Sequence, residues 1–264
     1  MGTPATPGTI RRTRQLARKW PGSHTFRHVR EQGPDMQLFW DERAREDAFY
    51  FVDNRLDYGM PDVERFWAGG DEALGVLLDL AGEAIDPGDV VVDIGCGLGR
   101  LTRAAAQQGA RVRALDVSSE MLARARRANA HLDDVDWIHG DGRTLRPIED
   151  ASVDAIISVV VFQHIPEPAI TLGYVREMGR VLRPGGWAAF QLSTDPRIHR
   201  PNQPLRGRML ARLGRAPRGQ TDPSWVGSAV DVDDLRATAG EVGMELRRVV
   251  SPGTQYCTVL AVRE

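Results

Sequence analysis

The residues best placed for chemistry form a glycine-rich loop directly after a run of β-branched side chains. Residues 90–92 are valines, Asp93 follows them, and glycines stand at positions 95, 97 and 99. Glycine lets the backbone turn sharply and approach a ligand closely, because it has no Cβ to obstruct either. A carboxylate at the strand's end can hold an ammonium group, whereas it would repel a phosphate. The stretch therefore predicts a buried strand, a ligand-binding loop and a helix.

A second acid strengthens the case for a nucleoside ligand. Asp116 ends another apolar run and stands about 20 residues beyond the loop, the separation at which one βαβ unit brings a carboxylate to ribose hydroxyls. The loop departs from the dinucleotide fingerprint, since Arg100 takes the place of its last glycine. Taken singly, Asp116 and Asp141 could each be a turn acid at a strand end. Their joint spacing favours ligand binding.

Five short segments in the same order carry a resemblance to a known family. They are residues 91–99, 115–121, 140–142, 154–158 and 180–186. Together they resemble the class I S-adenosylmethionine-dependent methyltransferases, and the resemblance extends over roughly residues 75–193. It is specific because all five segments occur in the family's order, whereas a glycine loop alone is a weak signal.

The resemblance implies S-adenosylmethionine as methyl donor and S-adenosylhomocysteine as product. It implies that Asp93 lies near the ammonium group, that Asp116 accepts both ribose hydroxyls, and that Asp141 receives the adenine amino group. The cofactor-binding residues that it implies are Asp93, Gly95, Cys96, Gly97, Gly99, Asp116, Val117, Met121, Asp141, Gly142 and Ser158. Cys96 is expected to be a loop residue rather than a nucleophile.

His164 is the candidate catalytic base. It follows the fourth expected strand, which brings it to the carboxyl edge of the sheet beside the methyl donor, and related small-molecule O-methyltransferases often carry a histidine here. A base with a pKa near neutrality suits removal of a hydroxyl proton during methyl transfer. The alternative is a structural histidine whose ring bonds a neighbouring backbone carbonyl.

The chain lacks the motifs of two other substrate classes. After the fourth strand there is no Asn/Asp-Pro-Pro-aromatic stretch, which is typical of methylation of nucleic-acid bases, and no acid to hold magnesium as in catechol-type enzymes. We therefore expect metal-independent O-methylation of a small molecule, with nucleic acid unlikely as a substrate. N- or C-methylation, a non-methylating S-adenosylmethionine-binding protein, and a nucleic-acid methyltransferase using the basic segments are the alternatives.

The region before the glycine loop divides into two parts. Residues 1–36 form a basic arm, expected to be a flexible tail or a site for an acidic partner. His24 and His28 lie one helical turn apart, as paired metal ligands do, but no Cys or carboxylate cluster lies near them, so a role without a metal is favoured. Residues 37–85 are expected to form a helical cap over the open end of the sheet. Among its clustered aromatic residues, Tyr50 and Trp67 are the candidates for lining the substrate pocket, the alternative being that they pack within the cap.

Alternating strand and helix patterns predict an α/β fold: a doubly wound, Rossmann-like, mostly parallel sheet of seven strands whose last strand is antiparallel. The methyltransferase domain spans residues 86–264 and includes a substrate-covering insertion at about 195–230. The expected strands are 90–95, 111–117, 135–139, 153–161, 187–193, 244–251 and 256–263. The expected helices are 71–84, 98–109, 119–130, 168–183, 205–213 and 232–242. Residues 184–186 are expected to end the helix at 168–183.

Composition restricts the class of protein further. The net charge of −2 and 42% hydrophobic residues fit a globular domain, and no apolar run approaches the ~18 residues of a membrane span. Lys19 is the only lysine, which argues against Schiff-base or P-loop chemistry. Two distant cysteines, Cys96 and Cys257, do not suggest a disulfide framework. We expect a cytoplasmic protein that needs no membrane partner and whose oligomeric state the sequence leaves open.

Overall fold

The computed structural model of the chain describes residue 2, residues 35–201 and residues 204–264. The predicted basic arm, with His24 and His28, lies outside the described residues except for its two ends at residues 2, 35 and 36. Over the described ranges, no helix combines the length and apolar character needed to cross a lipid bilayer.

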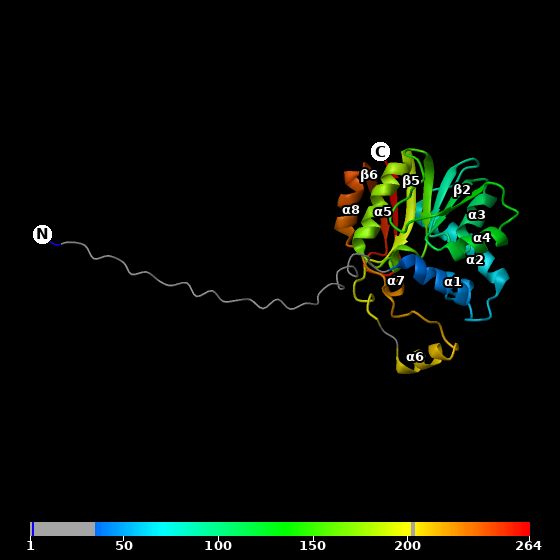
Figure 1. Ribbon diagram of the computed structural model, residues 1–264. Coiled ribbons are helices and arrows are strands. Elements are labelled where there is room, and N and C mark those ends of the chain that lie inside the picture. Colours follow the sequence, from blue (N-terminus) through cyan, green and yellow to red (C-terminus); the bar gives the residue numbers. More distant parts are fainter. Residues whose placement is uncertain (1, 3–34, 202–203) are drawn as a thin grey trace. The chain divides into compact units, whose positions relative to one another are not determined.

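A single mixed sheet organises the described part of the chain. Its strands run in the order β3-β2-β1-β4-β5-β7-β6 (Figure 1). The first five are parallel, whereas β7 is antiparallel to both β5 and β6. The predicted doubly wound sheet with a reversed last strand is therefore confirmed. The strands are β1 Val90–Ile94, β2 Arg111–Asp116, β3 Val135–His139, β4 Val153–Ser158, β5 Leu182–Leu192, β6 Met244–Val250 and β7 Cys257–Arg263.

Helices cover both faces of the sheet (Figure 1). Strand side chains alternate between faces, so Val91 packs in the apolar core beneath α2 and α3, whereas Val92 packs in the core beneath α5 and α8. Both valines are fully buried, which explains the continuous apolar run of a central parallel strand. The covering helices are α2 Val63–Ala81, α3 Arg100–Gln107, α4 Ser119–Ala128, α5 Pro168–Val181 and α8 Val232–Glu241.

Helix α1, Met36–Val52, is the element that crosses the carboxyl end of the sheet. It is broken at Asp47, whose φ of −164° and ψ of 86° are not helical. The Asp47 carboxylate accepts hydrogen bonds from the backbone amides of Tyr50 and Gly59, so it caps the second half of the helix. The predicted cap is thus only partly over the open end, because α2 lies against the sheet face beside α3.

Several predicted boundaries differ from the structure: the helix predicted at 71–84 is α2, Val63–Ala81, and two strand boundaries differ for local reasons. Strand β4 ends at Ser158 instead of residue 161, and Val160 just beyond it adopts a left-handed φ of 61°, which departs from the extended backbone of a strand. Strand β5 starts at Leu182, directly after α5, so the Pro184-Gly185-Gly186 segment belongs to the strand rather than ending the helix. The register of the β4 and β5 pair shifts there, which accommodates the extra residues as a bulge.

The segment between β5 and α8 leaves the sheet and returns to it. It contains the helix α6, Leu205–Arg212, and the short helix α7, Pro223–Val226. Helix α6 stands away from the sheet at the lower end of the molecule, whereas α7 lies against η1, Phe162–His164 (Figure 1). The predicted insertion therefore has two parts, of which only the second approaches the carboxyl end of the sheet.

Candidate functional site

A pocket opens at the carboxyl ends of β1, β2 and β4, beneath α1. It encloses about 970 Å³ of empty space, part of which is open to solvent. Ligands in open α/β sheets bind at this edge, where the strand order reverses. Nine predicted site residues line it: Asp93, Gly95, Cys96, Gly97, Asp116, Val117, Met121, Gly142 and His164.

The glycine loop joins β1 to α3 with every glycine at a positive φ. Gly95, Gly97 and Gly99 have φ of 72°, 55° and 85°, a region that side chains with a Cβ rarely enter. A Cβ on Gly95 would lie 2.5 Å from Val161, and one on Gly97 would lie 2.8 Å from a Val52 methyl. These two glycines therefore allow Val161 and Val52, which also line the pocket, to pack directly against the loop.

Gly99 faces β3 and the end of α4 instead of the pocket. A Cβ there would lie 2.5 Å from the ring of Trp137 on β3 and 3.0 Å from Asn129. Gly99 is absent from the pocket wall. It permits close packing between the start of α3 and the neighbouring strand, so the structure does not support the prediction that it contacts the cofactor.

Asp116 connects the glycine loop to the start of α4. It is 8% exposed, and its two carboxylate oxygens accept hydrogen bonds of 2.8 Å from the backbone amides of Gly97 and Ser118. Burial raises the pKa of this carboxyl, against the effect of those two hydrogen bonds. Each carboxylate oxygen has two acceptor positions, so capacity remains for ligand hydroxyls on the pocket side.

Asp93 is a buried carboxylate on the other side of the loop. It is 2% exposed, and Thr102 donates its hydroxyl to it at 2.6 Å. Burial raises its pKa to about 6, and the nearby charge of Asp116 adds to this effect. Arg100 acts in the opposite direction but pairs with Asp53 rather than with Asp93. A cationic ligand group would stabilise the ionised form of Asp93.

Replacement of Asp93 by Asn is expected to stabilise the ligand-free protein near pH 7. The folded protein holds the proton of Asp93 more tightly than the unfolded chain, so the stability linked to this group is present at low pH and is lost as the pH rises from about 4 to about 6. The pKa difference corresponds to about 3 kcal/mol. Thermal unfolding at pH 7.5 should show Asp93→Asn melting several degrees higher than the natural protein.

The same variants measured at pH 3 provide the control, because the carboxyl is then largely protonated in both the folded and the unfolded state and the difference should nearly vanish. Asp136→Asn, on the exposed side of β3, should leave the melting temperature unchanged at both pH values. An equal stabilisation at pH 3 and pH 7.5 would contradict the explanation from burial.

The start of α4 forms the next part of the wall. The Ser118 hydroxyl caps the helix by accepting a hydrogen bond from the backbone amide of Met121. The Met121 side chain is 2% exposed. Val117 and Met121 present apolar surface to the pocket, and Gly142 faces them from the loop after β3. These groups give this part of the wall an apolar surface.

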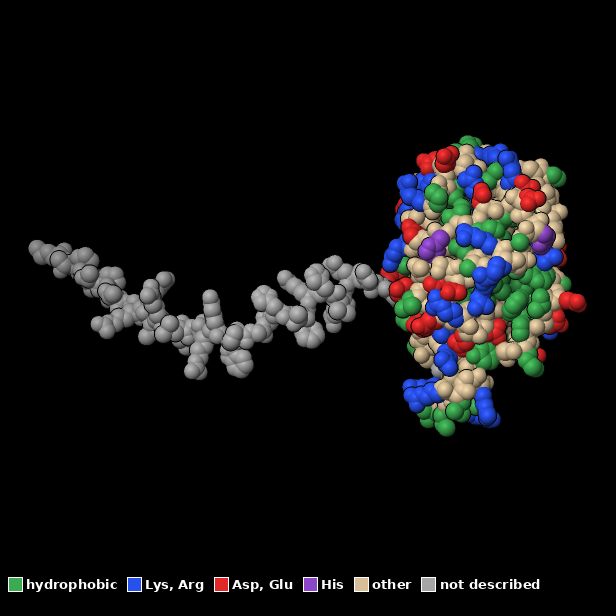
Figure 2. Space-filling model, turned by 45° about the vertical axis from the view of Figure 1, so that its right-hand side comes forward, with side chains coloured by type: hydrophobic (Ala, Val, Ile, Leu, Met, Phe, Trp, Pro, Cys, Tyr) green, Lys and Arg blue, Asp and Glu red, His purple; other side chains and the backbone are tan. Residues whose placement is uncertain are grey.

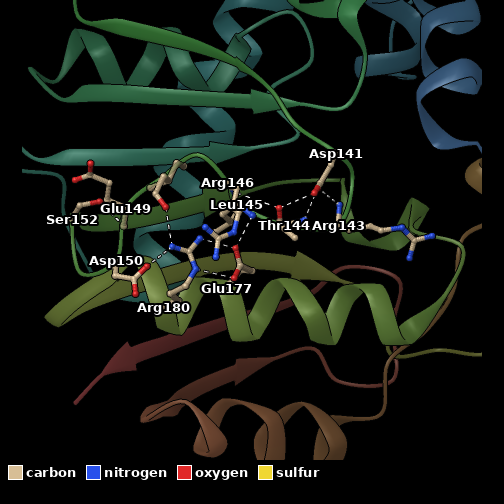
Figure 3. A network of polar contacts seen from close by, with 11 residues as sticks. Asp141, Arg143, Thr144, Leu145, Arg146, Glu149, Asp150, Ser152, Glu177 and Arg180 are labelled. Atoms are coloured by element: carbon tan, nitrogen blue, oxygen red, sulfur yellow. Dashed lines mark hydrogen bonds and ion pairs between the residues drawn. The ribbon is translucent and has the colours of Figure 1, made fainter.

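Asp141 does not line the pocket. Its carboxylate accepts hydrogen bonds from the backbone amides of Arg143 and Thr144 and from the Thr144 hydroxyl, all within 2.8 Å (Figure 3). These bonds lower its pKa although burial acts to raise it. The observed role is that of the turn acid considered as the alternative, and an adenine contact remains a prediction that requires this side chain to turn.

Cys96 and Ser158 are both buried, but only Cys96 lines the pocket. Burial raises the pKa of the Cys96 thiol well above its usual value, and the charges of Asp116 and Asp93 add to the effect. The nucleophilic thiolate is therefore disfavoured. Ser158 is fully buried outside the pocket wall and donates its hydroxyl to the Ile94 carbonyl at 2.9 Å, which ties β4 to β1.

Helix α1 supplies a roof that the sequence analysis did not resolve. Met36, Trp40, Phe51 and Val52 line the pocket from above. The periodic spacing of aromatic residues indicated a helix here, but it did not show which of its faces meets the sheet.

The two aromatic residues predicted for the pocket lie elsewhere. The ring of Tyr50 packs edge-on against Phe51 and Tyr58 at 5.4 Å in each case. Trp67 packs against Phe66, and the Arg103 guanidinium lies 5.0 Å from its ring. Neither residue is part of the pocket wall in this structure, so the observed packing is the alternative considered from the sequence, and a contact with the acceptor stays a prediction.

Polar contacts at both ends of α1 connect it to the elements around the pocket. Near the start of α1, Asp41 accepts hydrogen bonds from the Ser118 hydroxyl and the Glu120 amide at the beginning of α4. At its end, Asp53 pairs with Arg100 at 2.8 Å, and both side chains are less than 9% exposed. Because these partners adjoin Asp116 and the glycine loop, the position of α1 is linked to that of the ligand-binding residues.

His164 lies at the far end of the pocket, in η1. Its Nδ1 is 2.8 Å from the carbonyl oxygen of Trp225, so this nitrogen must carry the proton and donate it. The ring lies 5.6 Å from that of Trp40 and 5.1 Å from that of Trp225. Burial lowers the pKa of His164 to about 4, so the ring is neutral at pH 7 and its Nε2 is an acceptor.

Tyr174 of α5 also lines the pocket and was missed by the sequence analysis. It is 4% exposed, and burial raises the pKa of its hydroxyl, so the phenol stays protonated. Nothing near Tyr174 in the sequence distinguishes it from a core residue of an amphipathic helix. In the described ranges, no group of three or more His, Cys, Asp or Glu side chains is arranged to hold a metal ion.

The fold and the pocket define a class: a Rossmann-like domain whose site suits a nucleoside that also carries a cationic group. Residues 92–190 match the family described as a methyltransferase domain. This match agrees with the resemblance found in the sequence and identifies residues 92–190 as a methyltransferase domain.

Individual proteins agree with this assignment. The chain is 36% identical to a trans-aconitate 2-methyltransferase of Azoarcus over 59% of its length, and 31% identical to a ubiquinone biosynthesis O-methyltransferase of Paracidovorax citrulli over 38%. It spans only 60% and 42% of the lengths of these relatives. The crystal structure of magnesium protoporphyrin IX methyltransferase from Synechocystis with bound SAM matches 89% of this chain and all of that one, with a TM-score of 0.58 and 16% identity, which establishes the shared fold.

Proposed function

We propose that the protein transfers a methyl group from S-adenosylmethionine to the hydroxyl of a small-molecule acceptor, without a metal ion. The observation that carries the proposal is one pocket in which the glycine loop, Asp116 and His164 meet under an aromatic roof. The names of the relatives support a small acceptor. Two free, buried cysteines, Cys96 and Cys257, are consistent with a reducing, cytoplasmic setting.

The residues present fit the cofactor. Gly95 and Gly97 present only backbone to the pocket, which lets a ligand approach closely, and Asp93 is a buried carboxylate whose ionised form a ligand ammonium group would stabilise. Asp116 has free acceptor positions for ribose hydroxyls, and Val117 and Met121 offer apolar faces to the adenine. When bound, S-adenosylmethionine supplies a methyl group on a sulfonium, which is an excellent leaving group.

The protein's remaining tasks are alignment and proton removal. Trp40 and Phe51 confine the acceptor from above and exclude water, so that its oxygen approaches the methyl carbon in line with the carbon–sulfur bond. His164 accepts the hydroxyl proton at Nε2, because its Nδ1 already donates to the Trp225 carbonyl. A pKa of about 4 makes it a weak base, which favours acidic hydroxyls such as phenols over aliphatic alcohols.

The lowered pKa of His164 also supports a second candidate, methylation of an amine or carbon atom. Such nucleophiles need alignment more than a base, and the carbonyl bond to His164 would then be purely structural. A third possibility, a protein that binds the nucleoside without methylating, predicts binding but no product.

Titration calorimetry with S-adenosylhomocysteine and with NAD tests the binding site. We expect heat from the former alone, with micromolar or tighter affinity, and binding of NAD alone would overturn the proposal. A screen of phenols, carboxylic acids, amines and activated carbon acids, read as S-adenosylhomocysteine release, then identifies the acceptor class. Tight binding without release over the whole screen would favour the non-methylating protein.

A further inference from the structure

Helix α6 is an amphipathic helix with its apolar side turned outward. Leu205, Met209 and Leu213 are spaced four residues apart, so they form one stripe along the helix. Their exposed fractions are 77%, 65% and 67%, whereas Ala211 on the inner side is 8% exposed. A soluble domain ordinarily turns such a stripe toward its core, so an outward one points to a binding partner.

The charge around the stripe is of one sign. Arg206 and Arg212 flank it on its two sides, and Arg208 lies beside Arg212 on the helix surface. The structure gives none of these three an ion-pair partner among the described residues. Between Asp195 and Asp222 the sequence holds seven arginines and no acid. Figure 2 shows blue arginine and green hydrophobic side chains together on the protruding lobe.

We propose that this face of α6 docks on an anionic lipid surface. An apolar stripe flanked by arginines suits the boundary between headgroups and acyl chains, where the stripe enters the hydrocarbon and the guanidinium groups stay with the phosphates. Nucleic acid would satisfy the arginines but would leave three large aliphatic side chains in water. An anionic bilayer satisfies both features, and charge attraction makes its binding dependent on salt and lipid composition.

The connection of α6 to the rest of the domain is short and specific. Arg218 donates its Nε to the Ala211 carbonyl, and its backbone amide donates to Glu46 of α1. The chain then enters α7, where the Trp225 carbonyl contacts His164. A lipid-bound α6 would therefore be tied to the roof and the far wall of the pocket, although the docking itself does not depend on methyl transfer.

The test is sedimentation of the full chain with sucrose-loaded vesicles of phosphatidylcholine, with and without one third phosphatidylglycerol. We expect at least about tenfold stronger partitioning onto the anionic vesicles, weakened by raised salt. Two variants should each lose at least about tenfold of that binding: Leu205→Ser/Met209→Ser/Leu213→Ser removes the stripe, and Arg206→Gln/Arg208→Gln/Arg212→Gln removes the flanking charge.

A matched control replaces exposed apolar residues elsewhere, Met60→Ser/Val63→Ser/Val76→Ser, and should bind as the natural protein does. Circular dichroism should show every variant folded. Equal, weak binding to both vesicle types would overturn the proposal, as would undiminished binding of both α6 variants, which would place the lipid contact elsewhere in the chain. Salt-dependent binding to single-stranded RNA that both α6 variants lose, without vesicle binding, would also overturn it.

Discussion

Replacing Asp116 by Ala is expected to weaken binding of S-adenosylhomocysteine by at least about 100-fold. Two hydrogen bonds from ribose hydroxyls to a carboxylate contribute about 1.5–3 kcal/mol each, which corresponds to this factor or more. The substitution also removes the acceptors of the Gly97 and Ser118 amides, so the loop loses its connection to α4. Titration calorimetry gives the affinity directly.

A ligand lacking the ribose 2′-hydroxyl separates recognition from loop ordering. The natural protein should bind it more weakly than S-adenosylhomocysteine. Asp116→Ala should bind the two ligands equally, because the hydrogen bond between the 2′-hydroxyl and the Asp116 carboxylate is already absent in this variant. Asp136→Ala, an exposed acid on the adjacent strand, is the matched control and should retain full affinity. If Asp116→Ala still discriminates between the ligands, the ribose is held by another group.

The order of strands and helices was predictable because buried segments have a recognisable pattern of hydrophobic residues in the sequence. Val91 and Val92 face opposite layers, so β1 had to be apolar on both faces, and the glycines after it had to permit positive φ. The reversed strand β7 followed from the short turn that joins it to β6. Asp116 was predictable for the same reason, since its place at the end of a strand fixes it at the carboxyl edge.

The roof and the acceptor side of the pocket were not predictable in this way. Helical spacing groups Trp40 with Phe51 but does not say which face meets the sheet, and the break at Asp47 rotates the second half of α1. The Trp225 carbonyl that orients His164 lies 61 residues away in the chain. Contacts of this kind depend on tertiary packing, which has no local pattern.

Replacing His164 by Ala is expected to lower kcat by about 100- to 10,000-fold when the acceptor is a hydroxyl, the usual contribution of a positioned general base. The affinity for S-adenosylhomocysteine should change less than threefold, because the ring lies at the acceptor end of the pocket. His131→Ala, which removes an exposed histidine, is the matched control and should keep the natural rate.

The pH dependence distinguishes a base from a residue that only supports the pocket. Burial lowers the pKa of His164 to about 4, so the reactive, unprotonated ring is present at neutral pH and the natural rate should fall only as the pH drops toward 4. In His164→Ala the acceptor must ionise unaided, so the rate should rise about tenfold per pH unit up to the pKa of the acceptor hydroxyl. A loss of activity that is the same at every pH would assign His164 a structural role, held by its bond to the Trp225 carbonyl. An unchanged rate would instead favour methylation of an amine or carbon, for which alignment beneath Trp40 and Phe51 is sufficient.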